Sequence, residues 1–271
     1  MVQSSIAAEQ TAERDKSGKL RIALMGATGA IGKEIMHFAR QYAHKISEMI
    51  LIVRRRLNEW KDADFAPIRL TFIIKDSFDE FSIDEEEILY GVDAFLCTIG
   101  SRSSGKDFRT VDYQYPLDFA NMAKRLEIDH FGLLTASGAN PNAWFQYCKV
   151  KGEVERDIKQ LQLPQLTIFK PGLIKNRRND FRFTECIANK IPFITKIEAE
   201  ELGHYILLHA IEMCTNSEFP RGDDNVIELN TDQIRDGLRD VLGQDGQFRL
   251  CFMFDETKRC EYLCLSCNKR S

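Results

Sequence analysis

The sequence predicts an α/β fold in which helices cover both faces of a parallel sheet. Short, almost continuously apolar runs recur along the 271-residue chain, and segments with helical spacing separate them. Such continuous apolar strands are typical of parallel sheets that are buried on both faces. A glycine-rich turn, Gly26 to Gly32, joins the first apolar run to the first helical segment.

Six strands are expected, and right-handed crossovers between them give the spatial order 3-2-1-4-5-6. The apolar runs that predict them are 20–25, 49–53, 68–74, 92–98, 130–135 and 166–170. Helical spacing predicts helices at 33–42, 113–126 and 144–161. The pattern weakens beyond Pro171, where we expect a helix at 198–214, a short strand at 226–229 and a helix at 231–242.

Composition and charge exclude several classes of protein. The formal net charge of −4 does not suggest general nucleic-acid binding. No apolar run approaches the length needed to span a bilayer. Residues 1–18 are small and polar, lack the apolar core of a signal peptide, and carry acids that argue against a mitochondrial transit peptide. We therefore expect a disordered N-terminal tail and a cytoplasmic, and also nuclear, location.

No metal site is predicted from the cysteines and histidines. Four cysteines lie in apolar or helical segments and are expected to be reduced, packed thiols: Cys97, Cys148, Cys186 and Cys214. Four more crowd the C-terminal end: Cys251, Cys260, Cys264 and Cys267. Cys264 and Cys267 have a zinc-like spacing, but no second such pair and no histidine accompany them. The five histidines are dispersed and are interpreted as structural or surface residues.

The glycine-rich turn has the features of a dinucleotide-binding loop. Gly26 allows a sharp turn after the strand, Gly29 lets the backbone approach a pyrophosphate, and Gly32 lets the helix pack closely on the strand. The free N–H groups at the helix N-terminus then meet the phosphate charge. The loop residues expected at the cofactor are Gly26, Thr28, Gly29, Ala30, Ile31 and Gly32. The alternative is a tight turn without a ligand.

Residues after the second and third strands indicate which dinucleotide binds. Arg54 and Arg55 stand where an acidic residue usually accepts hydrogen bonds from a free ribose 2′-hydroxyl. A guanidinium can instead bind a 2′-phosphate bidentately, so the sequence favours NADP(H). The alternative is a solvated basic turn. Asp76, after the third strand, is placed to accept a hydrogen bond from the adenine amino group, although an Asp there is also common in turns.

The nicotinamide half is expected at the ends of later strands. Thr98 and Gly100 end the fourth strand, and Pro171 and Gly172 close the sixth. In open α/β sheets ligands bind at this carboxyl edge. These four residues are therefore predicted to border the cofactor, with plain turns as the alternative.

A tyrosine and a lysine on the helix after the fifth strand are candidates for proton transfer. Tyr147 and Lys151 are four residues apart and share one helical face. A phenol, with a reference pKa of about 10, is a poor acid or base at neutral pH, but a nearby ammonium favours the phenolate. Lys151 could also hold the nicotinamide ribose. Thr135, or Ser137 just beyond it, could orient the substrate oxygen. The alternative is an exposed helix face, and Trp144 and Phe145 before it are expected in the core or pocket wall.

Combined, these motifs resemble the extended or atypical short-chain dehydrogenase/reductase superfamily and, more narrowly, the Tat-interacting protein oxidoreductase family. The resemblance covers about residues 19 to 215. The motifs that carry it are Gly26–Gly32, Ile52–Leu57, Leu133–Ala139, Tyr147–Glu155 and Phe169–Gly172. It implies a Rossmann fold, NADPH binding, a Tyr/Lys reductase centre, an unknown natural substrate and regulatory roles through transport factors or transcription proteins.

Two departures from the family pattern affect this interpretation. Thr135 stands where the superfamily often has a catalytic serine, and the segment from about 216 to 271 does not resemble the usual C-terminal end. We divide the chain into a tail at 1–18, an NADP-binding Rossmann domain at 19–215, and a small substrate-side region at 216–271 that packs on that domain or trails from it.

The sequence thus predicts an NADP(H)-dependent oxidoreductase in which Tyr147 exchanges a proton, Lys151 supports it and Thr135 orients a carbonyl or alcohol oxygen. A second hypothesis is an NADPH-binding sensor or adaptor that recruits a regulatory protein with little or no turnover. We expect a monomer without a membrane span that does not bind nucleic acid directly.

Overall fold

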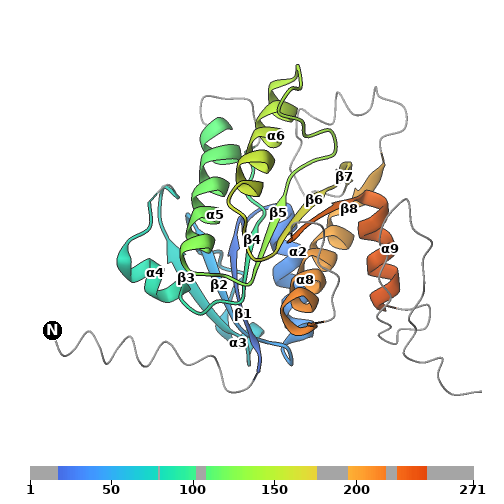
Figure 1. The fold of residues 1–271 in the computed structure, drawn as a ribbon. Helices are drawn as coiled ribbons and strands as arrows, with labels where there is room; N and C mark the ends of the chain where they lie inside the picture. The colour runs from blue at the N-terminus through green and yellow to red at the C-terminus, as the bar shows by residue number, and fades with distance from the viewer. Residues whose placement is uncertain (1–17, 79, 102–107, 176–194, 218–224, 243–271) are drawn as a thin grey trace, which may run out of the picture.

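The core of the protein is a seven-stranded, all-parallel sheet. The computed structural model describes residues 18–78, 80–101, 108–175, 195–217 and 225–242 (Figure 1). The strand order is β3-β2-β1-β4-β5-β6-β9, and every pairing is parallel. The α/β class and the predicted order of the first six strands are confirmed. The seventh strand, β9, pairs with β6 along its whole length.

The strands begin and end close to the predicted positions. They are β1 Leu20–Met25, β2 Ile46–Val53, β3 Arg69–Ile74, β4 Ala94–Cys97, β5 His130–Leu134, β6 Leu166–Lys170 and β9 Val226–Asn230. A separate two-stranded ladder, absent from the sequence prediction, is formed by β7 Leu173–Lys175 and β8 Lys196–Glu198. Its strands are three residues each, too short to show a periodic pattern.

The helices differ more from expectation. They are α2 Ala30–Ala39, η1 Arg40–Tyr42, α3 Asp62–Phe65, α4 Ile83–Leu89, η2 Thr110–Gln114, α5 Tyr115–Arg125, α6 Gln146–Lys159, α8 Ala199–Thr215 and α9 Thr231–Leu242. The short helices α3 and α4 were not predicted. The helix expected at 113–126 begins with a π-helical turn, η2. The helix expected from residue 144 starts at Gln146 instead.

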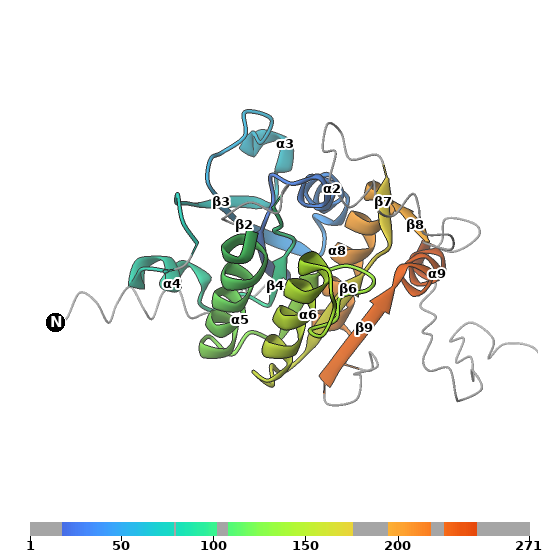
Figure 2. The same cartoon turned by 90° about the horizontal axis from the view of Figure 1, so that it is seen from above.

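Two apolar layers sandwich the sheet, as the view from above shows (Figure 2). Helices α5 and α6 cover one face, and α2 and α8 cover the other. Successive side chains of β1 alternate between the two layers. Ile22 and Leu24 pack on the α2/α8 side, and Ala23 and Met25 pack on the α5/α6 side. Burial of both faces is the reason why the strands appear as continuous apolar runs.

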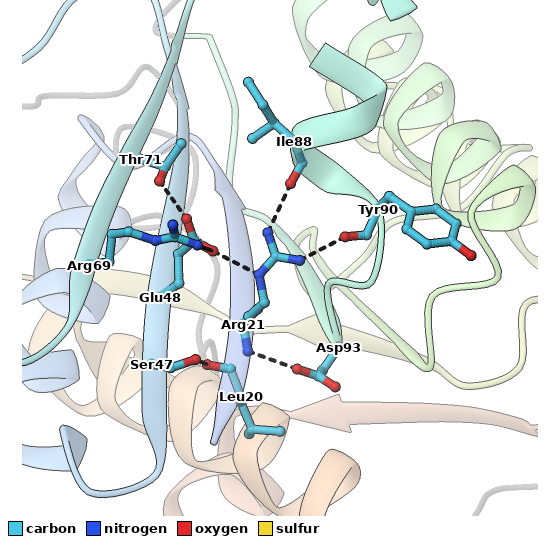
Figure 3. Close-up of polar contacts among 9 residues, drawn as sticks. All are labelled: Leu20, Arg21, Ser47, Glu48, Arg69, Thr71, Ile88, Tyr90 and Asp93. Atoms are coloured by element: carbon cyan, nitrogen blue, oxygen red, sulfur yellow. Dashed lines mark hydrogen bonds and ion pairs between the residues drawn. The ribbon is translucent and has the colours of Figure 1, made fainter. Parts of the chain in front are cut away.

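The amino edge of the sheet is held together by a buried carboxylate (Figure 3). Glu48 of β2 is only 3% exposed. Its Oε2 accepts from Arg21 Nε at 2.7 Å and from Arg69 Nη2 at 2.8 Å. Its Oε1 accepts from Thr71 Oγ1 at 2.5 Å. Burial alone would raise the pKa of Glu48, but these hydrogen bonds outweigh it and lower the pKa.

Arg21 extends this cluster to the segment before β4 (Figure 3). Its guanidinium donates to the backbone oxygens of Tyr90 at 2.7 Å and Ile88 at 3.1 Å. Its backbone N–H donates to Asp93 Oδ2 at 2.8 Å. One residue of β1 therefore links β2, the end of α4 and the entry to β4.

We expect Glu48→Gln to lower the free energy of unfolding by about 1.5–3 kcal/mol, because two guanidinium groups lose a charged acceptor. The lowered folded-state pKa means that this stabilisation is present above the unfolded pKa of about 4.3 and is lost as pH falls through the folded value. Urea unfolding near neutral pH and again in acid measures both effects. Glu59→Gln, which removes an exposed ion pair with Lys33, is the control. An equal loss in the two variants would contradict the prediction.

Candidate active site

The glycine-rich turn is required by the packing of the protein itself at two positions. Gly26 has a left-handed φ of 95°, and a Cβ there would lie 2.7 Å from the backbone nitrogen of Ile99, just after β4. A Cβ on Gly32 would lie 2.3 Å from the Gly26 carbonyl oxygen. Only glycine allows β1, β4 and α2 to approach this closely.

Gly29 differs from these two, because the described residues leave the space beside it open. Among those residues, a Cβ there would meet only the Gly26 carbonyl oxygen within 4 Å, at 3.2 Å. Gly29 is the N-cap of α2; no side chain among the described residues caps this helix, and its first turn has no acid. Thr28 is exposed, and Ala30 and Ile31 begin the helix. The free N–H groups of this turn suit an anion, so the turn fits a pyrophosphate.

The three consecutive arginines after β2 have different environments. Arg56 donates to Asp62 at 2.9 Å and lies over the Phe72 ring, with its guanidinium carbon 4.3 Å from the ring centroid. Arg54 and Arg55 are exposed, and no ion pair or hydrogen bond from either is found among the described residues. Asp76 is likewise exposed, two residues beyond β3. The two predicted 2′-phosphate ligands therefore have side chains that make no ion pair or hydrogen bond to the described residues.

The end of β4 lies against the glycine-rich turn. Thr98 donates to the Met25 carbonyl oxygen through its backbone N–H at 2.9 Å and its hydroxyl at 3.3 Å. Gly100 and Ser101 follow, and the Ser101 N–H donates to Asp112 Oδ2 at 2.7 Å. The predicted residues of β1 and β4 are therefore brought together at the carboxyl edge.

A buried ion pair holds the predicted lysine. Lys151 Nζ lies 2.9 Å from Asp112 Oδ1, and the two side chains are 5% and 0% exposed. Asp112 belongs to η2, a π-helical turn of the kind often found at functional sites. Sequence reasoning missed Asp112, because no local spacing connects it to a helix that begins more than thirty residues later. The exposed-face alternative for Lys151 is wrong.

Tyr147 lies two residues into α6 and one helical turn before Lys151. It is half-buried, and its ring stacks on the buried Phe108 with centroids 5.9 Å apart. Trp144, just before the helix, is 96% exposed and Phe145 is also exposed, so their predicted core placement is wrong. Both residues precede the first turn of α6 and face solvent.

The Thr135 hydroxyl has a partner that the sequence did not reveal. Its Oγ1 donates to Glu155 Oε1 at 2.5 Å and lies 3.4 Å from the Phe169 carbonyl oxygen. Thr135 is buried, whereas Ser137 is exposed and its backbone N–H donates to the Pro171 carbonyl oxygen at 2.8 Å. Which of the two hydroxyls meets a substrate stays a prediction.

Glu155 belongs to a chain of charges that runs outward to β9. Lys170 Nζ donates to Glu155 Oε2 at 2.9 Å and to Glu228 Oε2 at 3.0 Å, and Lys159 also pairs with Glu228. Burial raises the pKa of Glu155 in spite of hydrogen bonds from Thr135 and Lys170. Burial alone would lower the pKa of Lys170, but its two carboxylate partners raise it.

The turn after β6 joins the site to the C-terminal segment. The Gly172 N–H donates to Thr231 Oγ1, at the start of α9, at 2.8 Å. A Cβ on Gly172 would lie 2.1 Å from the Thr195 carbonyl oxygen, so the turn is tightly packed. Residues 226–242 therefore border the predicted nicotinamide side, and the domain boundary at 215/216 stays a prediction.

The remaining sequence predictions concern metals, thiols and membranes. Across the described ranges no cluster of potential metal ligands occurs, and the described cysteines Cys97, Cys148 and Cys214 form no disulfide bond. Cys186, the four C-terminal cysteines and residues 1–17 of the predicted tail lie outside those ranges. No helix in the part that the structure describes is long and apolar enough to cross a membrane.

Comparison with known proteins identifies relatives, although no family model matches the chain. Protein HTATIP2 of Rattus norvegicus is 31% identical over 170 residues, covering 62% of this chain and 68% of the relative. The mitochondrial protein FMP52 of Lodderomyces elongisporus is 25% identical over 234 residues, covering 80% and 96%. The structure of MoeE5 in complex with UDP-glucuronic acid and NAD has a TM-score of 0.58 at 11% identity, covering 78% and 75%. That last likeness concerns the fold alone.

The relatives overturn one sequence prediction. FMP52 proteins of several fungi, including Scheffersomyces stipitis, Aspergillus oryzae and Debaryomyces hansenii, are named mitochondrial. The predicted cytoplasmic and nuclear location is contradicted by these names. It was inferred from acids in residues 1–18, a local feature that does not determine location by itself.

We expect Asp112→Ala to lower the free energy of unfolding by about 3–5 kcal/mol, because it leaves the Lys151 ammonium buried without its partner. Adding Lys151→Met should restore much of this loss, since the buried charge disappears with it. Urea unfolding of both variants at neutral pH measures the difference. A double variant no more stable than Asp112→Ala would contradict the prediction.

Proposed function

Because this chain belongs to the family of Protein HTATIP2, an atypical short-chain dehydrogenase/reductase family, we propose that it is an NADP(H)-dependent oxidoreductase that interconverts a carbonyl and an alcohol. One observation carries the proposal most directly. Lys151 is held by Asp112 in a buried ion pair, one helical turn from the half-buried Tyr147. An ion pair buried in this way is costly, and a role beside a reacting phenol would explain why it is kept.

The cofactor has a consistent set of predicted contacts. The turn from Gly26 to Gly32 and the start of α2 would bind the pyrophosphate, and Arg54 and Arg55 would bind the 2′-phosphate. The remaining contacts would come from Asp76 at the adenine and from Thr98, Gly100, Lys151, Pro171 and Gly172 at the nicotinamide half. When bound, the cofactor supplies or accepts the hydride.

The protein side chains would manage the proton and the orientation of the substrate. Tyr147 would donate its phenolic proton to a carbonyl oxygen, or take one from an alcohol. The positive charge of Lys151 would stabilise the phenolate that forms, while Asp112 fixes the position of the ammonium. Thr135 or Ser137 would orient the substrate oxygen.

The proposals for location and partners rest on relatives and on family resemblance. The names of the FMP52 relatives support a mitochondrial location. A small carbonyl compound is the proposed substrate, and the resemblance to the Tat-interacting protein oxidoreductase family supports a regulatory protein as a second partner. A monomer is the proposed oligomeric state.

We expect NADPH to bind about tenfold to a hundredfold more tightly than NADH, because charge-assisted hydrogen bonds to the 2′-phosphate contribute about 1.5–3 kcal/mol. Replacing both Arg54 and Arg55 by Ala should remove this preference. Arg56→Ala is the matched control, since Arg56 is already paired with Asp62. Titration calorimetry with both cofactors measures the affinities. Equal affinities in the unmodified protein would refute the NADP(H) assignment.

We expect Tyr147→Phe to lower turnover at least about a hundredfold, as for a lost general acid, while NADPH affinity changes by less than about twofold. A panel of carbonyl compounds, followed by the loss of NADPH absorbance, identifies a usable substrate. Gly29→Val is the companion variant: it should abolish NADPH binding without unfolding the protein, because the described residues leave space beside Gly29 and the valine side chain would fill the space proposed for the pyrophosphate. If NADPH binds but no carbonyl compound is reduced, the adaptor hypothesis replaces the enzyme hypothesis.

A further inference from the structure

We propose that Glu155 is a positioning residue that determines whether the Thr135 hydroxyl accepts or donates a hydrogen bond toward the substrate oxygen. The inference rests on the proposed function, and it adds a residue whose charge state would select between alcohol and carbonyl. It starts from the short contact between Thr135 Oγ1 and Glu155 Oε1, at 2.5 Å between two buried side chains.

A threonine hydroxyl has one proton and two lone pairs. An ionised carboxylate can only accept, so with Glu155 ionised the Thr135 proton is committed to Glu155. Thr135 then offers only lone pairs to any other group. An alcohol can donate into such a lone pair, whereas a carbonyl oxygen cannot.

Protonation of Glu155 reverses this arrangement. A neutral carboxyl carries its own O–H and can donate it to Thr135 Oγ1, which frees the threonine proton. Thr135 can then donate to a substrate carbonyl oxygen, in competition with the Phe169 carbonyl oxygen 3.4 Å away. The protonated form of Glu155 therefore suits carbonyl reduction, and the ionised form suits alcohol oxidation.

Burial and neighbouring charges act on the ionisation of Glu155 in opposite directions. Burial and the negative charge of Glu228, on β9, disfavour ionisation. The Thr135 hydroxyl and the Lys170 ammonium, on β6, favour it. Lys159, from the next turn of α6, neutralises Glu228 rather than Glu155. This balance contrasts with Glu48, which two guanidinium groups hold ionised.

Position on α6 connects this pair to the proposed reaction. Tyr147, Lys151 and Glu155 are spaced by four residues and form one stripe along the helix. Lys151 is anchored on Asp112, and Glu155 on Thr135 and Lys170. Thr135, whose hydroxyl contacts Glu155, directly follows β5. The Thr135 hydroxyl is therefore hydrogen-bonded to the same helical stripe that carries the proposed proton donor, Tyr147.

The first experiment measures how reduction depends on pH. The rate of NADPH oxidation with 9,10-phenanthrenequinone, an activated dicarbonyl, is followed from about pH 5 to pH 9. We expect the rate of the unmodified protein to fall about tenfold per pH unit above the Glu155 ionisation. We call this decrease in rate with rising pH the alkaline limb. In Glu155→Gln, whose amide can still donate to Thr135, the limb should disappear, and the rate at low pH should stay within about threefold of that of the unmodified protein. Persistence of the limb in Glu155→Gln would overturn the inference.

Matched variants separate positioning from mere stability. Glu153→Gln makes the same substitution on α6 at an ion pair with Arg109 and should retain the limb. Thr135→Ser should retain it as well, because the hydroxyl is kept. Thr135→Val should lose the limb and reduce more slowly at every pH. If Thr135→Val behaves like the unmodified protein, Thr135 does not transmit the charge state of Glu155.

An infrared pH titration tests the pair without any substrate. The absorption band of the protonated Glu155 carboxyl is identified by subtracting the infrared spectrum of Glu155→Gln from that of the unmodified protein. We expect this band to disappear as the pH is raised, and to persist to higher pH in Thr135→Val, which removes a hydrogen bond to the ionised form. A band unchanged by Thr135→Val, or no such band, overturns the inference even if phenanthrenequinone is not reduced. Absence of turnover alone counts against the proposed function.

Discussion

The ion pair between Lys151 and Asp112 is the interaction on which the candidate site depends. Both side chains are almost completely buried, so each charge needs the other to offset the loss of solvation. Asp112 is itself tied to the end of β4 through the Ser101 N–H. The pair therefore sets where α6 lies relative to β4, and with it the position of Tyr147 one turn earlier.

Two buried glutamates show how the same residue type serves different ends of the sheet. At the amino edge, Glu48 meets two guanidinium groups and a hydroxyl, and its pKa is lowered. Near the carboxyl edge, Glu155 meets one ammonium and one hydroxyl with Glu228 close by, and its pKa is raised. The first arrangement fixes a permanent charge that links strands. In the second arrangement, burial outweighs the hydrogen bonds that favour the charged form.

The sequence predicted the sheet well because its strands are buried on both faces and appear as apolar runs. The order of six strands and the placement of Gly26, Gly29 and Gly32 followed from that pattern and from the requirements of a tight turn. The contacts of Thr135 and Lys151 could not be predicted, since their partners Glu155 and Asp112 are brought near only by the crossovers.

Other misses have equally physical causes. Helices α3 and α4 have four and seven residues, too few for a clear 3.6-residue period. Trp144 was expected in the core or the pocket wall, yet it precedes α6 and is exposed to solvent. The seventh strand was predicted as a strand, but its place beside β6 depends on a pairing that the local sequence does not encode.

The two tryptophans of the chain give it a built-in pair of optical reporters. Trp60 is almost fully buried, with its ring centroid 6.2 Å from that of Phe72, so its emission depends on whether the domain is folded. Trp144 is surrounded by water in the folded protein and lies three residues before Tyr147. Its emission should already be that of an indole in water before unfolding, and quenchers dissolved in the solvent should reach it freely. Fluorescence can therefore distinguish events at the entrance of α6 from the integrity of the core without an added label.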